Sequence, residues 1–312
     1  MSFQVSINNN EQYPIITLTD DATNCYAEIY AFGAILNKFG IQNETLSIQV
    51  VDAFNSVQEA IDQMVPGFKS SFLSPFTCRM NKGTYQYNNS TYTIQKFYLA
   101  PHAIHGLVYD SVYSVVHTLA NEHSASVQLR TEYRGTDAGY PFSYFVNHIW
   151  KLQANNQLSV YTFVQNANKV PIPYAQGWHP YFTFGHSIND CTLQFDSNQM
   201  LVFDNTLLPT GEIITDTRFQ QATQLKDTFL DNCFQLNKGN PSCTLSNNKV
   251  QLIITPDEAY PFLQVYTPPH RNSIAIENLS GAPDCFNNEM GLLHIPPSQM
   301  VEFTTSYQLK PL

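Results

Sequence analysis

Apolar and polar residues alternate over many short segments of this chain, which is the pattern of half-buried β-strands. Residues 127–133, 262–266 and 301–309 are rich in Val, Thr, Tyr and Phe, which favour strands. Residues 144–152 and 158–164 lie on either side of a short stretch that contains two asparagines. These two segments are predicted to form a β-hairpin.

Two more hairpins are predicted from short polar connections between apolar runs. Residues 85–87 and 92–94 flank Asn-Asn-Ser, and residues 243–245 and 250–254 flank Ser-Asn-Asn-Lys. Asparagine tolerates the positive φ angles that tight turns need. Each of these segments therefore predicts two antiparallel strands joined by a turn.

One segment has a helical signature. Ser56 precedes a mixed apolar run that ends at Met64, and Glu59 follows the serine by three residues, which is a capping-box pattern. This predicts one short helix at most. Because no linker, repeat or shift of composition divides the chain, we expect a single domain over residues 1–312. Its predicted class is all-β, a large antiparallel β-sandwich or super-sandwich.

Charge and cysteine usage limit the partners. Acidic residues outnumber basic ones by 25 to 15, and no Lys/Arg-rich stretch exists, so neither nucleic acid nor a membrane surface is expected as a partner. The N-terminus lacks a signal-peptide pattern, and residues 26–36 are too few to span a bilayer. The cysteines lack C-x-x-C spacing and predict free thiols in a cytoplasmic protein; they are Cys25, Cys78, Cys191, Cys233, Cys243 and Cys285.

Two segments carry the strongest candidates for chemistry. His179 lies in Gly-Trp-His-Pro-Tyr-Phe (177–182), and Glu277 ends an apolar strand at the turn into Ser-Gly-Ala-Pro. A histidine and a half-buried carboxylate suit general acid–base catalysis near neutral pH, and aromatic rings such as Trp178 suit the face of a sugar. The residues alone also allow a structural interpretation: a rim glutamate in a salt bridge and a histidine bonded within an aromatic cluster.

Four other polar residues stand in apolar or glycine-flanked surroundings. His102 and His105 have the spacing of metal ligands on a helix, but Pro101 and Gly106 bound the segment and further ligands are not evident. No metal is therefore expected, and a loop histidine in a pocket is preferred. Arg79 and Asp231 suit either a ligand hydroxyl or a structural backbone partner. The sequence contains no G-x-x-x-x-G-K-S/T, G-x-G-x-x-G, G-x-S-x-G or H-E-x-x-H, so no cofactor is predicted.

Four segments with these candidates follow one another along the chain. They are Pro-Phe-Thr-Cys-Arg-Met (75–80) with the hairpin after it, His-Ala-Ile-His-Gly (102–106), Gly-Trp-His-Pro-Tyr-Phe (177–182) and Ile-Glu-Asn-Leu-Ser-Gly-Ala-Pro-Asp-Cys-Phe-Asn (276–287). In this order they resemble the motifs of the aldose 1-epimerase (galactose mutarotase) family. The resemblance runs from about residue 10 to the end of the chain. It implies a galactose mutarotase-like β-sandwich.

The resemblance implies a role for each matching residue. Glu277 would take the proton from the C1 hydroxyl of an aldose, and His179 would protonate the ring oxygen. His105 would assist near C1 and the ring oxygen. Arg79 and Asp231 would hold sugar hydroxyls. The ring would open to the aldehyde, rotate about C1–C2 and close from the other face, which requires no metal or cofactor.

Trp178 and His102 complete the predicted sugar site. The chain also departs from the family pattern at four positions: the family usually has Asn at His102, a second glycine at Leu107, often Asn at Cys78 and often His at Asn232. These positions are expected near the sugar, so they bear on substrate identity before they bear on catalysis.

The predicted activity is therefore aldose 1-epimerase, an isomerase acting on a free hexose. The Trp-His-Pro-Tyr-Phe segment also resembles the hexose-6-phosphate epimerase branch, but the arginines are not clustered in sequence, which favours a neutral sugar. A silent carbohydrate-binding protein on the same fold is the alternative. A glycoside hydrolase or lyase would need two facing carboxylates, for which only Glu277 and Asp231 are available. The expected partner is a small-molecule sugar, and the expected state is a monomer or weak homodimer.

Overall fold

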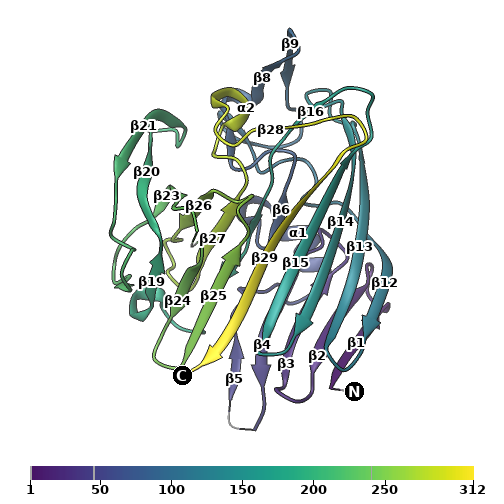
Figure 1. The fold of residues 1–312 in the computed structure, drawn as a ribbon, viewed down its shortest axis with the longest axis vertical. Helices are drawn as coiled ribbons and strands as arrows, with labels where there is room; N and C mark the ends of the chain where they lie inside the picture. The colour runs from purple at the N-terminus through teal and green to yellow at the C-terminus, as the bar shows by residue number, and fades with distance from the viewer. Residues whose placement is uncertain (1, 45, 240) are drawn as a thin grey trace.

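Three antiparallel sheets make up most of the molecule (Figure 1). The computed structural model describes residues 2–44, 46–239 and 241–312. Neither α-helix in this part of the chain is long and apolar enough to cross a bilayer. The predicted all-β class is confirmed, because every strand ladder is antiparallel and helices are few.

The largest sheet has nine strands and lies toward the viewer in Figure 1. In spatial order its strands are β12 (Ser114–Ala120), β13 (Ser124–Arg134), β14 (Ser143–Gln153), β15 (Gln157–Asn166), β29 (Met300–Pro311), β25 (Val250–Pro256), β24 (Cys243–Ser246), β19 (Thr192–Phe195) and β22 (Thr223–Gln224). Every second residue of β14 is buried, as the alternation predicts. The hairpins predicted at 144–164 and 243–254 are β14–β15 and β24–β25.

An eight-stranded sheet lies behind the first and carries the predicted glutamate and histidine segments. Its strands in spatial order are β21 (Pro209–Thr215), β20 (Ser197–Phe203), β23 (Asp231–Leu236), β26 (Phe262–Tyr266), β27 (Ile274–Leu279), β17 (Gly177–His179) and β6 (Ser71–Leu73), with β18 (Tyr181–Phe182) also paired to β27. All six residues of β27 are buried, and strands pair with both of its edges.

The remaining sheets are smaller. A five-stranded sheet contains β1 (Phe3–Asn8), β2 (Ile15–Asp20), β3 (Cys25–Tyr30), β4 (Leu36–Gln42) and β5 (Ser47–Gln49). A three-stranded sheet contains β10 (Tyr98–Leu99), β11 (His102–Ile104) and β7 (Arg79–Met80). Two pairs complete the set, β8 (Thr84–Tyr87) with β9 (Ser90–Thr93) and β16 (Ile172–Tyr174) with β28 (Leu293–Ile295). The pair β8–β9 is the hairpin predicted at residues 85–94.

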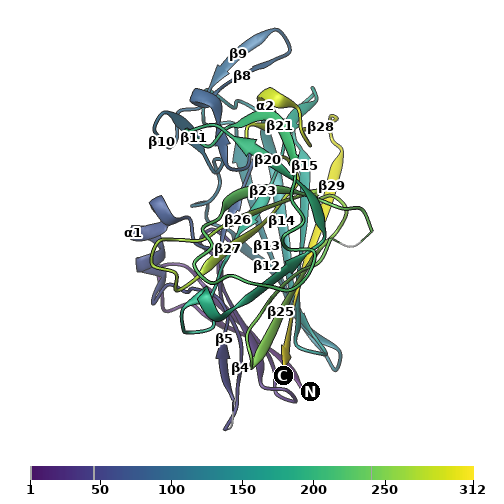
Figure 2. The same cartoon turned by 90° about the vertical axis from the view of Figure 1, so that its left-hand side faces the viewer.

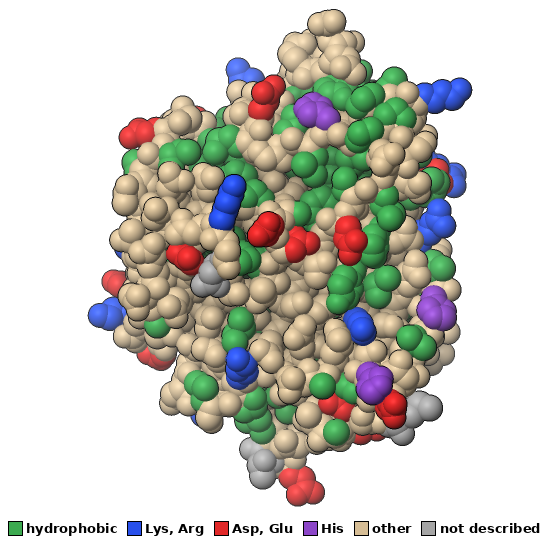
Figure 3. All heavy atoms as spheres, viewed as in Figure 1, with side chains coloured by type: hydrophobic (Ala, Val, Ile, Leu, Met, Phe, Trp, Pro, Cys, Tyr) green, Lys and Arg blue, Asp and Glu red, His purple; other side chains and the backbone are tan. Residues whose placement is uncertain are grey.

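Aromatic side chains join the two largest sheets. Trp150 of β14 packs against Trp178 of β17 with ring centroids 5.3 Å apart, and Phe182 of β18 packs against Tyr307 of β29 at 5.9 Å. Much of the chain's high Tyr and Phe content is therefore used in the buried core. On the face shown in Figure 3, charged side chains of both signs are scattered and form no basic cluster.

The helix predicted after Ser56 is α1 (Val57–Gly67). The Ser56 hydroxyl accepts the backbone N–H of Glu59 at 3.0 Å, as the capping box predicts. The Glu59 carboxylate accepts the N–H of Asn55, one residue before the cap. A second short helix, α2 (Cys285–Asn288), exceeds the single helix expected from the sequence. It follows the Gly-Ala-Pro-Asp turn and is too short to show a helical period. Two single-turn 3₁₀ segments, at Asn81–Gly83 and Ile188–Asp190, complete the elements.

Candidate functional site

A cavity of about 400 Å³ opens beside β27, between the eight-stranded sheet and the C-terminal end of α1. Figure 2 shows α1 on the side of this sheet that faces away from the nine-stranded sheet. Five of the predicted site residues line the cavity although they come from five separate segments: Arg79, His105, His179, Asp231 and Glu277. The structure thus brings together residues that are up to about two hundred positions apart in the sequence.

Glu277 lies inside β27 and not at its end, which corrects the sequence interpretation. The strand continues to Leu279, and Glu277 pairs with Gln264 of β26. Glu277 is 1% exposed, so this carboxylate is fully buried, whereas the sequence interpretations placed it half-buried or at the rim of the protein. The surrounding strands hold the backbone of this carboxylate rigidly, which favours a fixed position for its side chain.

Gly177 allows β17 to lie close against β27. A Cβ at this position would stand 2.5 Å from a side-chain carbon of Leu279 and 2.8 Å from the carbonyl oxygen of Asn278. The close backbone approach expected at this glycine is therefore made by β27. Two residues later, the carbonyl of His179 accepts the N–H of Ser70 at 2.9 Å, which fixes the far end of the short strand.

His179 and Glu277 contact each other at the buried side of the cavity. The His179 Nε2 lies 3.3 Å from the Glu277 Oε1, and both side chains are almost fully buried. Burial lowers the pKa of His179 to about 4. Burial and the nearby Asp231 raise the pKa of Glu277 well above its ordinary value, and Arg79 opposes this only in part.

These opposite shifts determine how many protons the pair carries. Because the pKa of the histidine falls and that of the glutamate rises, the two side chains together hold one titratable proton between the lowered and the raised value. This count is the same whether the proton sits on the carboxylate or on the imidazole. A pair with one proton can accept a proton at one atom and donate one at another.

His105 lies beside His179 in the cavity wall. Its ring packs edge-on against His179 with centroids 4.8 Å apart and against Phe68 at 4.7 Å. Its backbone has a φ of 63°, and its N–H donates to the carbonyl of Cys78 at 2.9 Å. Burial first, then His179 and Arg79, lower the pKa of His105 well below its usual range, so this imidazole is neutral near pH 7.

Arg79 and Asp231 provide two further polar side chains in the cavity wall. The Asp231 Oδ1 accepts the Gln264 side-chain N–H at 2.8 Å, and burial raises the Asp231 pKa although Arg79 opposes the shift. The half-buried Arg79 guanidinium makes no hydrogen bond or ion pair with the residues that the structure describes. Its N–H groups are therefore available to a ligand.

Trp178 and His102 do not line the cavity. Successive residues of a strand face opposite sides, so when His179 faces the cavity, Trp178 faces the core. Its indole packs against Phe72 at 5.0 Å and His148 at 4.9 Å. His102 is buried on β11 and accepts the N–H of Lys82 at its Nδ1, 3.0 Å away. The placement of these two residues corrects the prediction that they contact a sugar.

The structure adds residues that sequence reasoning missed. Tyr181 lines the cavity, and its ring centroid is 5.1 Å from that of His179. Because side chains two positions apart in an extended chain face the same way, the sequence could have placed Tyr181 beside His179. No feature of the sequence pointed to Gln264, because only the pairing of β26 with β27 brings it beside Glu277. Lys69 lines the rim and is paired with Asp52 at 2.8 Å, so its charge is compensated.

The end of the glutamate motif has a structural role. The N–H of Asp284 donates to the carbonyl of Arg79 at 2.7 Å, and its Oδ1 accepts the N–H of Asn81 at 2.8 Å. The Thr77 hydroxyl donates to the carbonyl of Gly281 at 2.8 Å. These bonds hold the arginine segment and the glutamate segment together across some two hundred residues.

The match to a family model agrees with this arrangement. A model described as "Aldose 1-epimerase" matches residues 14–311. The chain belongs to the aldose 1-epimerase family. The uncharacterized protein YihR of Escherichia coli (strain K12) is 27% identical to this family member over 230 residues, which cover 71% of this chain and 72% of YihR.

Solved structures show the fold of this aldose 1-epimerase family member to be galactose mutarotase-like. The galactose 1-epimerase from Lactobacillus acidophilus NCFM matches with a TM-score of 0.85 at 19% identity and covers 99% of both chains. A galactose mutarotase-like protein from Clostridium acetobutylicum matches with a TM-score of 0.87 at 14% identity, over 100% of this chain and 99% of that one. The expected β-sandwich is thereby confirmed.

Proposed function

We propose that this protein is a mutarotase that interconverts the α and β anomers of a free hexose, with Glu277 as the base and His179 as the acid. The observation that carries the proposal is the buried contact of 3.3 Å between these two side chains in a cavity of about 400 Å³, a size typical of small-molecule sites. Membership of the aldose 1-epimerase family supports the same reaction class.

The proposed reaction needs one proton to leave the sugar and one to enter it. Ionised Glu277 takes the proton of the C1 hydroxyl while the C1–O5 bond breaks, and protonated His179 gives its proton to O5. The products are the open-chain aldehyde, a neutral carboxylic acid and a neutral imidazole. Rotation about C1–C2 turns the other face of the aldehyde toward the O5 hydroxyl, and both protons then return as the ring closes.

The arrangement of the pair suits this cycle. The states before and after ring opening are the two ways of placing a single proton on the His179–Glu277 pair. Because burial disfavours the charged form of each partner, the neutral state after ring opening is favoured over the ion pair before it. Each general acid or base of this kind contributes about 10²–10⁴-fold to a rate.

The other cavity residues are proposed to position the sugar. His105, which is neutral near pH 7, offers a hydrogen bond near C1 and O5. The free Arg79 guanidinium and the Asp231 carboxylate offer a donor and an acceptor to hydroxyl groups. Of the Lys and Arg side chains that line the cavity, Lys69 is already paired with Asp52 and only Arg79 is left to a ligand, which favours a neutral sugar over a sugar phosphate.

Polarimetry on freshly dissolved α-D-glucose and α-D-galactose tests the proposal. The wild type is expected to speed the optical drift well beyond buffer, and Glu277→Gln to lower the rate by at least about 10²-fold because the base is lost. Calorimetric titration of Glu277→Gln with the active sugar is expected to show retained binding. Glu258→Gln, which alters an exposed glutamate outside the cavity, is the matched control and should keep the wild-type rate.

The opposite result has a clear meaning. If the wild type accelerates the mutarotation of no aldose or aldose phosphate, the acid–base assignment fails. The protein would then be a carbohydrate-binding protein on a mutarotase-like fold.

A further inference from the structure

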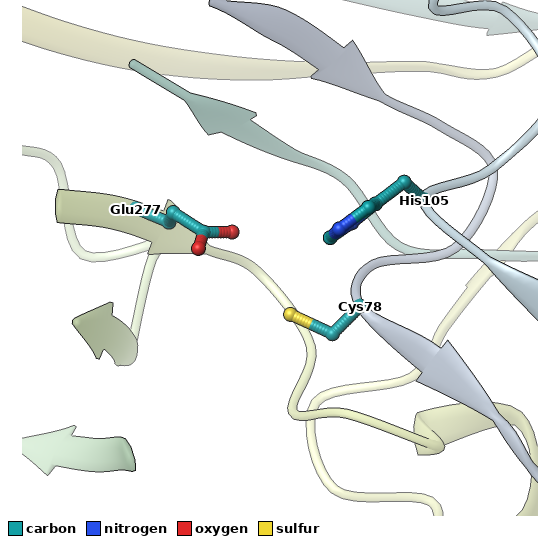
Figure 4. Close-up of side chains that lie close together, drawn as sticks. All are labelled: Cys78, His105 and Glu277. Atoms are coloured by element: carbon teal, nitrogen blue, oxygen red, sulfur yellow. The ribbon is translucent and has the colours of Figure 1, made fainter. Parts of the chain in front are cut away.

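Three side chains with metal-binding atoms converge in the cavity (Figure 4). The Cys78 thiol, an imidazole nitrogen of His105 and a Glu277 carboxylate oxygen all lie within 4.8 Å of one another. They come from the segment before β7, the turn after β11 and the interior of β27. Figure 4 shows the three side chains pointing toward a common space.

Polar atoms of this cluster lack partners in the folded chain. His105 Nδ1 and Glu277 Oε2 are buried and have no hydrogen bond to any described residue. The Cys78 thiol, in a residue that is 6% exposed, also makes no hydrogen bond within the described chain. A buried polar atom without a partner is costly and calls for an explanation, and a bound ion is one that would satisfy all three of these atoms together.

We propose that Cys78, His105 and Glu277 bind a thiophilic divalent cation of the Zn²⁺ type in the sugar cavity. One thiolate, one imidazole and one carboxylate are the donor types that Zn²⁺ takes in proteins, at about 2.3 Å for sulfur and about 2.0–2.2 Å for nitrogen and oxygen. Such bond lengths around a tetrahedral ion place the donors roughly 3.5 Å apart. The present separations are within 4.8 Å, so they exceed this value by at most about 1.3 Å, the difference between 4.8 and 3.5 Å, which small side-chain rotations would remove.

The backbone conformation fixes the positions of two of the three proposed ligands. Cys78 and His105 both have positive φ angles, 46° and 63°, and the N–H of His105 donates to the carbonyl of Cys78. Gly106 follows in close contact with Ser74, where a Cβ would lie 2.3 Å from the Ser74 carbonyl oxygen. Non-glycine residues with positive φ store strain that the surrounding structure must support, and such strain concentrates at functional sites.

The same donors discriminate between cations. Ca²⁺ and Mg²⁺ prefer sets of oxygen ligands, whereas a thiolate selects softer ions such as Zn²⁺. The three donors leave one position of a tetrahedral ion open, as in zinc sites that keep a water or another exogenous ligand. The site therefore suits Zn²⁺, and Co²⁺ as its spectroscopic substitute.

Metal and sugar would exclude each other. Glu277 would serve as ligand to the cation and as base to the sugar, so a bound cation would inhibit mutarotation by competition with the substrate. This inhibition rests on the proposed function, whereas binding of the cation does not. A cysteine at position 78 is one of the departures from the family pattern, so this sensitivity would belong to this chain and its Cys-bearing relatives.

Titration with Co²⁺ tests the site directly. The reduced wild-type protein is expected to show the thiolate-to-cobalt charge-transfer absorption and the intense visible bands of a tetrahedral centre. Cys78→Ser is expected to lose the charge-transfer absorption. Cys233→Ser, which alters a neighbouring buried cysteine that is not in the cluster, should keep it. Absence of this absorption in the wild type, or its persistence in Cys78→Ser, would overturn the proposal.

Competition of Zn²⁺ with a chelating dye gives the affinity. Cys78→Ser and Glu277→Gln are each expected to weaken Zn²⁺ binding at least tenfold, with the unfolding midpoint of each variant measured to verify folding. Zn²⁺ is also expected to raise the midpoint of the wild type, since it binds the native state, and to raise that of Cys78→Ser less. Equal affinity in wild type and both variants would place Zn²⁺ elsewhere and refute the assignment.

Kinetics separates this inference from the proposed function. If the wild type catalyses mutarotation, Zn²⁺ should raise the apparent KM for the sugar and leave kcat unchanged. If the protein proves catalytically silent, the Co²⁺ and Zn²⁺ measurements still decide whether the site exists. Inhibition of the Cys78→Ser variant at the same Zn²⁺ concentration as the wild type would contradict the proposal.

Discussion

At the scale of single residues, burial has opposite effects on the two members of the proposed acid–base pair. Removing Glu277 from water favours its protonated form, and removing His179 from water favours its neutral form. Neither effect is visible in a sequence, because each depends on the strands that surround the side chain. The alternation of a strand then separates neighbours in the chain, so that His179 faces the cavity and Trp178 faces the core.

The pH dependence of kcat/KM follows from the proton count of this pair. Below the pKa of His179, near 4, a second proton binds and Glu277 can no longer act as a base. Above the raised pKa of Glu277, the shared proton is lost and His179 has none to deliver. We therefore expect a broad bell-shaped profile with an acid limb near pH 4, measured by polarimetry in the presence of a chelator and corrected for buffer catalysis. An acid limb between pH 6 and 7, where an ordinary histidine titrates, would contradict this assignment.

At the scale of elements, the register of three strands builds the polar wall of the cavity. Gln264 of β26 pairs with Glu277 on one side and with Cys233 on the other, and its amide reaches Asp231. A shift of one residue in this register would turn these side chains to the other face of the sheet. The site thus depends on the pairing of β23, β26 and β27 as much as on the residues themselves.

Replacing Gln264 tests this wall. Gln264→Leu removes the N–H that Asp231 accepts, so the pKa of Asp231 should rise further and its hold on a sugar hydroxyl should weaken. A hydrogen bond to a charged group contributes about 1.5–3 kcal/mol, so KM is expected to rise at least about tenfold while kcat changes less. Gln251→Leu on β25, outside the cavity, is the control and should leave both constants unchanged. A loss confined to kcat would instead assign Gln264 to the chemical step.

At the scale of the whole molecule, the core contains neutral histidines. His148 is fully buried between Thr162 and Tyr113, and its pKa falls to about 3. His179 and His105 are also buried with lowered pKa values. In the unfolded chain each would titrate near 6.5. Between this value and the lower folded value, the unfolded chain binds more protons, so the folded state loses stability as the pH falls.

This loss can be measured by urea unfolding at pH 7, 6 and 5. Each buried histidine contributes up to about 1.4 kcal/mol per pH unit to the decline, and the raised pKa values of Glu277 and Asp231 oppose part of it. His148→Gln is expected to lower the free energy of unfolding at neutral pH, because two buried hydrogen bonds change. It should also reduce the slope with pH by about 1.4 kcal/mol per unit. An unchanged slope would mean that His148 is not held neutral by burial.

The amino-acid sequence by itself determined the local features of this protein. Period-two alternation predicted the strands, asparagine-rich turns predicted the hairpins, and Ser56 with Glu59 predicted the start of α1, because each signal acts over only a few residues. The order of four motifs indicated the family and four of the predicted site residues that line the cavity, Arg79, His105, His179 and Glu277. The tertiary structure alone decided that Glu277 is fully buried, that Trp178 and His102 lie outside the cavity, and that Cys78 joins His105 and Glu277. These outcomes depend on strand pairing between distant segments and on which face of each strand is covered, and no local pattern encodes either.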